Sequence, residues 1–257
     1  MAELLVLPAL LGYGEAAFAY AGGLRGASNY GRLGIWGVRI GWLAQTALLA
    51  AQATTSDGFP WGTWAGALNL LCWLVVTGYL VWGSNPRYRL LGIAVMPVAA
   101  ALLALAWAGG GTGVGGAEGA GWALDAHVGL MLAAFASFTV AAAVAILYLF
   151  EERRLKRRDA HVLRLRLPSL EALDRLAARV ALIGLALLSA GIVVGVTRLE
   201  AGEIDLAMTV TMLLWALYAA ALVLRRETGL QGRRLAWSLV VGFTLVGVVL
   251  PLTHFAS

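Results

Sequence analysis

The segment WALDAHVGLMLAAFASFTVAAAVAILYLF, residues 122–150, is 29 residues long and carries only one charged side chain, Asp125. The next eight residues, EERRLKRR at 151–158, include seven charged ones. Because the hydrocarbon core of a bilayer needs about 20 consecutive apolar residues per helix, this stretch predicts a transmembrane helix. We expect its last turns to leave the membrane and end in water.

The rest of the chain repeats this pattern. Hydrophobic residues make up 61% of the 257 residues and charged residues 13%, against about 45–50% and about 25% in soluble domains. The composition predicts an all-α, polytopic membrane protein with about eight transmembrane helices, forming a single integral membrane domain over 1–257. The apolar runs are 4–21, 34–53, 62–82, 90–108, 122–150, 177–197, 206–224 and 235–254.

The basic residues predict which way the helices run. Of 19 Lys plus Arg, 17 lie in the connections after the first, third, fifth and seventh runs, and only Arg198 lies in an even-numbered connection. Cytoplasmic loops of membrane proteins are rich in Lys and Arg. This asymmetry predicts both termini outside, in a cell (plasma or inner) membrane, and explains the net charge of +5 without nucleic acid.

Two connections have a distinct composition. Residues 151–179 form the largest basic cytoplasmic loop, in which Ser169 can cap a helix with Glu171 in its first turn. We expect that helix to be interfacial, because three leucines recur at helical spacing. Residues 109–121 form an outer loop with eight glycines in thirteen positions. Such a loop is expected to be flexible.

Two of the three histidines are expected at one face of the membrane. His127 opens the fifth run and His254 ends the eighth, so both lie at the outer face, whereas His161 lies in the basic cytoplasmic loop. Imidazoles from facing helices are common axial ligands of haem iron. The alternative is that each histidine is an interfacial residue with its polar tip in water.

The remaining residues of interest are the single cysteine and a group of tryptophans, and packing or membrane anchoring is one explanation for each. Cys72 is the only cysteine, which excludes an internal disulfide or a Cys-x-x-Cys site; its apolar surroundings predict a packing role. Four tryptophans lie near the predicted outer face, where they form either an aromatic belt or a stacking shelf for a porphyrin. They are Trp61, Trp64, Trp107 and Trp122.

Charges inside the predicted spans are few. Glu15 and Arg39 interrupt the first two runs at similar depths, so they either pair across adjacent helices or Arg39 extends to the headgroups. A transporter would need more buried charges and broken helices than this sequence shows. No residue in the membrane has the pattern of a general acid or base, so we do not expect a self-sufficient enzyme.

Several ordered segments resemble the cytochrome c assembly family. DAHVGLMLAAFASF (125–138) is similar to its segment in which a histidine opens a helix, and SDGFPWGTWAGALNLLCW (56–73) to its Gly-His-Phe-Pro segment. Residues 212–255, with their Gly-x-x-Gly-Arg-Arg turn and terminal histidine, are similar to its last two helices. LYLFEERRLKRR and LPSLEALDRL resemble the shorter, HemX-like or YpjD-like eight-helix branch.

The resemblance implies a haem-binding membrane subunit for cytochrome c maturation. His127 and His254 match the two outward-facing haem ligands of the family, with haem b as cofactor and Trp61, Trp64 and Trp122 as candidate contacts. Apocytochrome c and a second assembly subunit are the implied partners, besides haem and the lipid bilayer.

Two departures from the family pattern are present. Asp57-Gly58-Phe59-Pro60 lacks the histidine of the family's motif, and RLEAGEIDLAMTV replaces the tryptophan-rich segment before the penultimate helix. The alternative hypothesis is therefore a HemX-like membrane regulator or scaffold in haem metabolism, working through 151–179.

Overall fold

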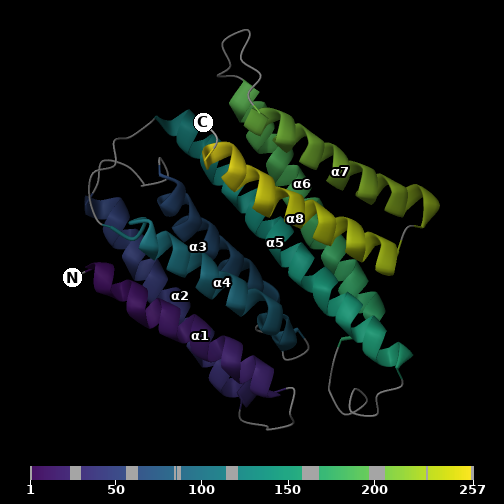
Figure 1. Cartoon of the computed structure of the whole chain (residues 1–257), viewed down its shortest axis with the longest axis horizontal. Helices are drawn as coiled ribbons and strands as arrows, with labels where there is room; N and C mark the ends of the chain where they lie inside the picture. The colour runs from purple at the N-terminus through teal and green to yellow at the C-terminus, as the bar shows by residue number, and fades with distance from the viewer. Residues whose placement is uncertain are drawn as a thin grey trace. The chain divides into compact units, whose positions relative to one another are not determined.

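The fold is all α-helical in the part of the chain that the computed structural model describes, which is residues 2–23, 30–55, 63–83, 85, 88–113, 121–157, 168–196, 206–229 and 231–255. Eight α-helices and two short 3-10 helices follow one another there (Figure 1). They are η1 (Ala2–Leu5), α1 (Val6–Gly23), α2 (Tyr30–Thr55), α3 (Trp64–Gly83), η3 (Arg89–Leu91), α4 (Gly92–Ala108), α5 (Trp122–Lys156), α6 (Leu170–Val196), α7 (Leu206–Thr228) and α8 (Arg233–Phe255).

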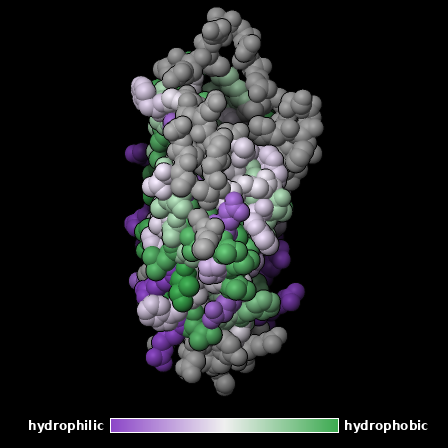
Figure 2. Space-filling model, turned by 90° about the vertical axis from the view of Figure 1, so that its left-hand side faces the viewer, coloured by the Kyte–Doolittle hydropathy of each residue, from purple (hydrophilic) through white to green (hydrophobic). Residues whose placement is uncertain are grey.

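Seven helices are long and apolar enough to cross a membrane, so the protein is a multi-pass membrane protein. These seven correspond to the first seven predicted runs, and α8 occupies the range of the eighth. Large hydrophobic side chains are exposed on most helices, and Figure 2 shows such residues, in green, on one side of the molecule. The orientation of the termini stays a prediction.

The helices divide into two compact units. The first contains α1 to α4, and the second contains α5 from Ala126 onward together with α6, α7 and α8. The expectation of a single integral membrane domain over 1–257 stays a prediction.

In the first unit, glycines bring α1 and α2 into backbone contact. A Cβ placed on Gly12 would lie 2.6 Å from the carbonyl oxygen of Gly37 and 3.0 Å from the Cα of Gly41. A Cβ on Gly37 would in turn lie 2.8 Å from the Gly12 carbonyl oxygen. Small residues allow this close approach in membranes, where packing replaces the hydrophobic effect as the driving force between helices.

A buried network of amide and hydroxyl groups joins the helices of this unit. The Tyr13 hydroxyl donates to Oε1 of Gln45 (2.7 Å), and Nε2 of Gln45 donates to Oδ1 of Asn69 (2.9 Å). Nδ2 of Asn69 donates in turn to Oε1 of Gln52 (3.2 Å). Cys72 is fully buried beside the network, and its thiol donates to a backbone carbonyl of α4. The predicted packing role of Cys72 is confirmed.

The first residues of the glycine-rich connection pack against this network. Nε2 of Gln52 donates to the backbone carbonyls of Gly111 (3.1 Å) and Gly113 (2.8 Å). Gly111 lies so close to the backbone of Ala65 that no side chain would fit, and Thr112 is buried. Residues 109–113 are therefore held by α2 and α3. The remainder of the predicted loop, 114–120, lies outside the described residues.

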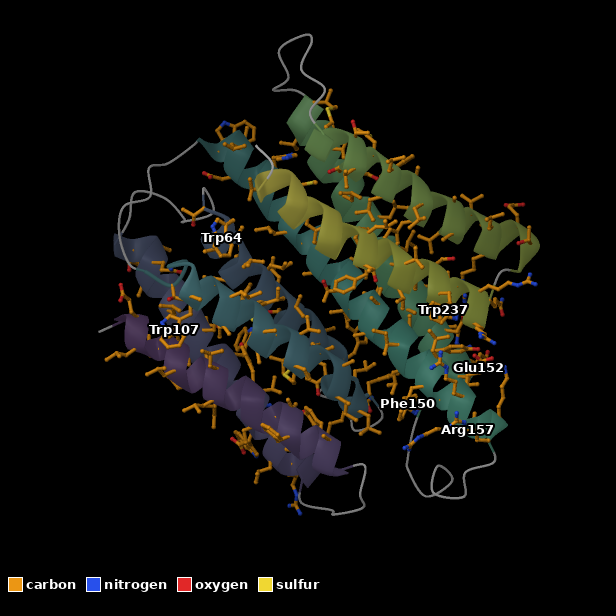
Figure 3. All side chains as sticks on the ribbon, in the orientation of Figure 1. Trp64, Trp107, Phe150, Glu152, Arg157 and Trp237 are labelled. Carbon is orange, nitrogen blue, oxygen red and sulfur yellow. The ribbon has the colours of Figure 1, made fainter. Side chains whose placement is uncertain are left out.

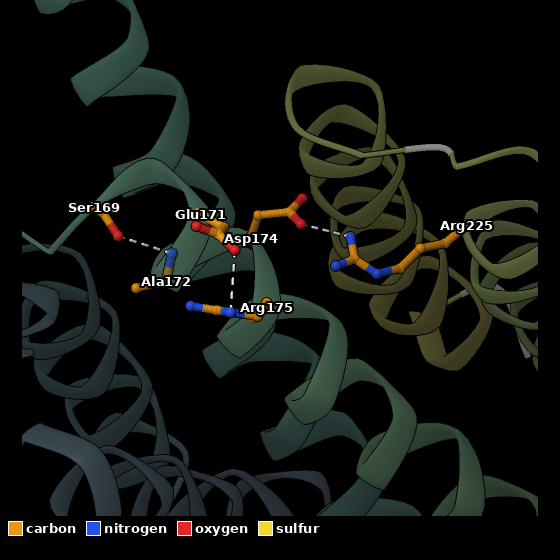
Figure 4. Close-up of polar contacts among 6 residues, drawn as sticks. All are labelled: Ser169, Glu171, Ala172, Asp174, Arg175 and Arg225. Atoms are coloured by element: carbon orange, nitrogen blue, oxygen red, sulfur yellow. Dashed lines mark hydrogen bonds and ion pairs between the residues drawn. The ribbon is translucent and has the colours of Figure 1, made fainter.

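In the second unit, polar and aromatic contacts join α5, α6, α7 and α8. Asp174 of α6 pairs with Arg225 of α7 through Oδ2 (2.7 Å; Figure 4), and its Oδ1 accepts the backbone N–H of Gly232 (2.8 Å). The rings of Phe138 and Tyr218 stack with centroids 3.9 Å apart. These contacts tie the α7–α8 turn to the start of α6.

The start of α6 agrees with the predicted cap. Oγ of Ser169 accepts the backbone N–H of Ala172 (3.2 Å), and Glu171 lies in the first turn (Figure 4). The helix then continues without interruption to Val196, so it begins seven residues before the predicted sixth run. Leu173 and Leu176 are buried in the unit. The placement of this helix start at a membrane interface stays a prediction.

Of the two alternatives for Glu15 and Arg39, the ion pair between them is not formed, which corrects that hypothesis. Both residues are described and exposed, and the described ion pairs involve other residues. The Arg39 guanidinium lies over the ring of Trp36, its carbon 5.3 Å from the ring centroid. The pair does not form because of the way each helix is rotated about its own axis. The helices α1 and α2 meet through their glycine faces, and both charges point away from that contact.

Candidate functional site

His127 is held by a backbone carbonyl of the neighbouring helix. Its Nδ1 lies 2.7 Å from the carbonyl oxygen of Gly191 on α6. A carbonyl oxygen only accepts hydrogen bonds, so Nδ1 must carry the proton and act as the donor. In the neutral ring the lone pair is then on Nε2, which is the atom available to bind a metal.

Glycines on α6 make room for this imidazole. A Cβ on Gly195 would lie 2.7 Å from Cε1 and 2.8 Å from Nδ1 of His127, and 3.6 Å from its Nε2. The Nδ1–Cε1 edge of the ring therefore faces α6, and Nε2 is the more distant nitrogen. About one and three turns further along α5, Met131 and Phe138 lie against Gly191 and Gly184 in the same way. The glycine stripe of α6 thus sets the position of the histidine.

The contacts of the second unit also give the position of His254 along the helix axes, relative to the residues of α5. A Cβ on Gly232 would lie 2.7 Å from the Tyr148 hydroxyl, which places the start of α8 near the end of α5. Phe138 stacks on Tyr218, whose ring lies against Gly242 of α8. The helices α5 and α8 therefore run antiparallel, with 148 level with 232 and 138 level with 242.

The same register extends to the two histidines. Following α5 back to His127 and α8 forward to His254 covers 21 and 22 residues, about 32 Å along each axis at 1.5 Å per residue. The backbones of His127 and His254 therefore lie within about one helical turn of the same level. Figure 1 shows the end of α8 on the side of the unit where α5 starts. The side chain of His254 lies outside the described residues.

The candidate tryptophans that the structure describes lie on different helices. Trp64 opens α3 of the first unit, where it is 52% exposed and lies against Gly109; Figure 3 shows it at the same end of that unit as Trp107. Trp122 is the first residue of α5 and is 82% exposed. Trp61 and the remaining histidine, His161, lie outside the described residues. The structure thus brings His127 together with α6, and Trp122 precedes it by five positions on the same helix.

The geometry of His127 is compatible with one axial ligand of haem iron. No group of three or more His, Cys, Asp or Glu side chains that could hold a metal ion occurs in the described part of the chain. Haem iron takes one or two axial ligands from the protein. A histidine with its Nδ1 fixed by a carbonyl provides such a ligand through Nε2.

A family model now connects this geometry with known proteins. The model for the Cytochrome C assembly protein matches residues 61–255, which include all the helices from α3 to α8. The chain belongs to the cytochrome c assembly protein family. Both His127 and His254 lie within the matched range, whereas α1 and α2 precede it. Searches of curated proteins and of solved structures found no match.

Two parts of this cytochrome c assembly protein were not anticipated from its sequence. Gly191 and Gly195 position His127, and their Gly-x-x-x-Gly spacing is a known signal for close helix packing in membranes. The Gly191 carbonyl itself carries no sequence signal, because every residue has one. Asp174 and Arg225, whose side chains are 8% and 18% exposed, are charged partners on separate helices that only the fold brings together.

Proposed function

We propose that this protein is a haem-handling membrane subunit for cytochrome c maturation, in which His127 and His254 hold haem b at the outer face of the membrane. The observation that carries the proposal is the hydrogen bond from Nδ1 of His127 to the Gly191 carbonyl. Metal-ligating histidines commonly donate their second nitrogen in this way, which fixes both tautomer and ring orientation. Membership of the family supplies the context.

Each of the chain's groups has a separate part in this proposal. His127 binds through Nε2, the Gly191 carbonyl holds its ring, and Gly195 leaves the space in which the ring lies. His254 is the proposed second axial ligand, since its backbone is level with His127. Trp122 offers an exposed indole one and a half turns from His127. When bound, haem supplies the vinyl groups that an apocytochrome's cysteines attack, so the protein provides position and ligation.

The proposal is tested on the purified protein in detergent, with haem supplied. Wild type is expected to show a low-spin, six-coordinate ferric spectrum, because two imidazoles impose a strong axial field. The His127→Ala and His254→Ala variants should each give a five-coordinate or water-ligated iron, and added imidazole should restore part of the original spectrum. The double variant should lose haem.

The matched control is His161→Ala, which removes the third histidine and should leave the spectrum unchanged. A double variant that retains a full complement of haem with an unaltered spectrum would contradict the assignment of both ligands. If wild type takes up no haem at all, the HemX-like regulatory or scaffolding function becomes the better explanation.

A further inference from the structure

We propose that the outer face of the α1–α2 pair binds a second copy of this chain, through reciprocal pairing of Glu15 in one copy with Arg39 in the other. The inference concerns a part of the chain outside the family match, which begins at residue 61. It is independent of the proposed haem site.

Both charges lie well inside predicted membrane spans. Glu15 is seven residues from the end of the span Glu3–Gly22, and Arg39 is eight residues from the start of the span Gly31–Thr54, which is about 10–12 Å of helix in each case. Both side chains are on the exposed surface of the chain. An exposed charge at this depth is costly in lipid, and such residues normally face a protein partner or a polar cavity.

The two charges are at nearly the same depth. Gly12 of α1 lies between the levels of Gly37 and Gly41 of α2, so Arg39 is level with Gly12 and Glu15 is about 5 Å further along α1. The Arg39 guanidinium lies over Trp36, one turn back along α2. Because α2 runs antiparallel to α1, that displacement brings the guanidinium towards the level of Glu15.

The same contacts explain why the charges do not meet within one chain. Arg39 shares a stripe of α2 with Trp42 and Thr46, which hydrogen-bond to α3. It is therefore on the side of α2 away from α1. The outward surface of α2 between Arg39 and α1 is apolar and exposed, and it is formed by Trp36, Ile40 and Leu43.

Two opposite charges at one depth, separated by an apolar surface, make a face that is complementary to itself. A two-fold axis along the membrane normal preserves depth, so it brings Glu15 of each copy to Arg39 of the other. Isologous contacts of this kind form the commonest oligomers, in which residue i meets j and j meets i. A lipid surface or a partner of single charge would satisfy only one of the two groups. The charge pattern therefore favours a second copy.

Cysteine cross-linking in intact membranes tests this arrangement. The natural Cys72 is fully buried, so a cysteine introduced by Ile40→Cys reports on its own surroundings. Ile40 lies near the proposed axis and should form a disulfide-linked dimer with copper phenanthroline. The matched control is Leu213→Cys on α7, which is similarly exposed (66% against 54% for Ile40) but belongs to the second unit.

Charge reversal then decides the mechanism. In the Ile40→Cys background, Glu15→Arg or Arg39→Glu should lower the association constant of the dimer at least about tenfold, since each change creates two like-charge contacts. The double exchange should restore cross-linking. Co-elution with wild type in detergent confirms that each variant folds.

Three results would overturn the proposal. The first is cross-linking at Ile40→Cys no stronger than at Leu213→Cys. The second is cross-linking that survives both single reversals. The third is a cross-linked product whose mass shows a different protein, which would assign the face to another membrane partner.

Discussion

Gly195→Ala should weaken haem binding while leaving the stability of the fold almost unchanged. The new methyl group would lie 2.7 Å from Cε1 of His127, whereas carbon atoms prefer about 3.5–4.0 Å. The imidazole must therefore move by about 1 Å. Because its Nδ1 is hydrogen-bonded to the Gly191 carbonyl at 2.7 Å, the displacement breaks or distorts that bond.

The two effects on stability nearly cancel. Loss of one hydrogen bond costs about 1 kcal/mol, and replacing glycine by alanine within a helix stabilises it by about 0.5–1 kcal/mol. Loss of a group that orients a metal ligand typically lowers affinity about 10–100-fold. We therefore expect the thermal unfolding temperature to stay close to that of wild type and the haem dissociation constant to rise by about 10–100-fold.

Gly129→Ala is the matched control for this experiment. Gly129 is on α5 beside His127, but a Cβ there would meet no atom within 4 Å, so the change should stabilise the helix without moving the ring. Haem titration and thermal unfolding in one detergent compare the two variants. Equal haem affinity in Gly195→Ala and Gly129→Ala would refute the positioning role of the Gly191 carbonyl.

Two further predictions follow from the polar groups. Asp174→Asn should destabilise the second unit by about 2–3 kcal/mol, because Arg225 would be left largely buried without its partner. Glu171→Gln removes only an exposed pair and should cost about 0.5 kcal/mol or less in the same thermal or denaturant unfolding assay. Equal effects of the two changes would contradict a stabilising role of the buried pair. Reporter fusions should place Gly113 outside and Arg157 inside, as the distribution of basic residues requires, and an inside signal at Gly113 would reverse the assignment of the histidines to the outer face.

Hydropathy was sufficient to predict where the helices lie in the sequence, but not the residues at which they begin and end. The fifth run was bounded at 150, whereas α5 continues to Lys156. The start of α6 falls seven residues before the apolar run at 177, because Glu171, Asp174 and Arg175 lower the hydropathy of its first two turns. The Ser169 cap marked the true start, since capping depends on a side-chain oxygen and not on apolar content.

Contacts between helices were less predictable, because depth in the membrane does not determine rotation about the helix axis. The sequence predicts similar depths for Glu15 and Arg39, yet they do not pair, since Gly12, Gly37 and Gly41 decide which faces of α1 and α2 meet. His127 could be selected from its sequence context. The carbonyl that orients it could not, because a backbone group has no residue signature.

The two proposals concern different units, and amide side chains fix α2 within the first of them. Gln45 and Gln52 of α2 hydrogen-bond to Asn69 of α3 and to the carbonyls of Gly111 and Gly113, so α2 is fixed to helices within the family match through its inner face. Its outer face is left exposed. A change on the outer face, such as Arg39→Glu, should therefore alter cross-linking without loosening this network or the contact between α5 and α6. Gly195→Ala should do the reverse, since the three atoms nearest to a Cβ at Gly195 all belong to His127.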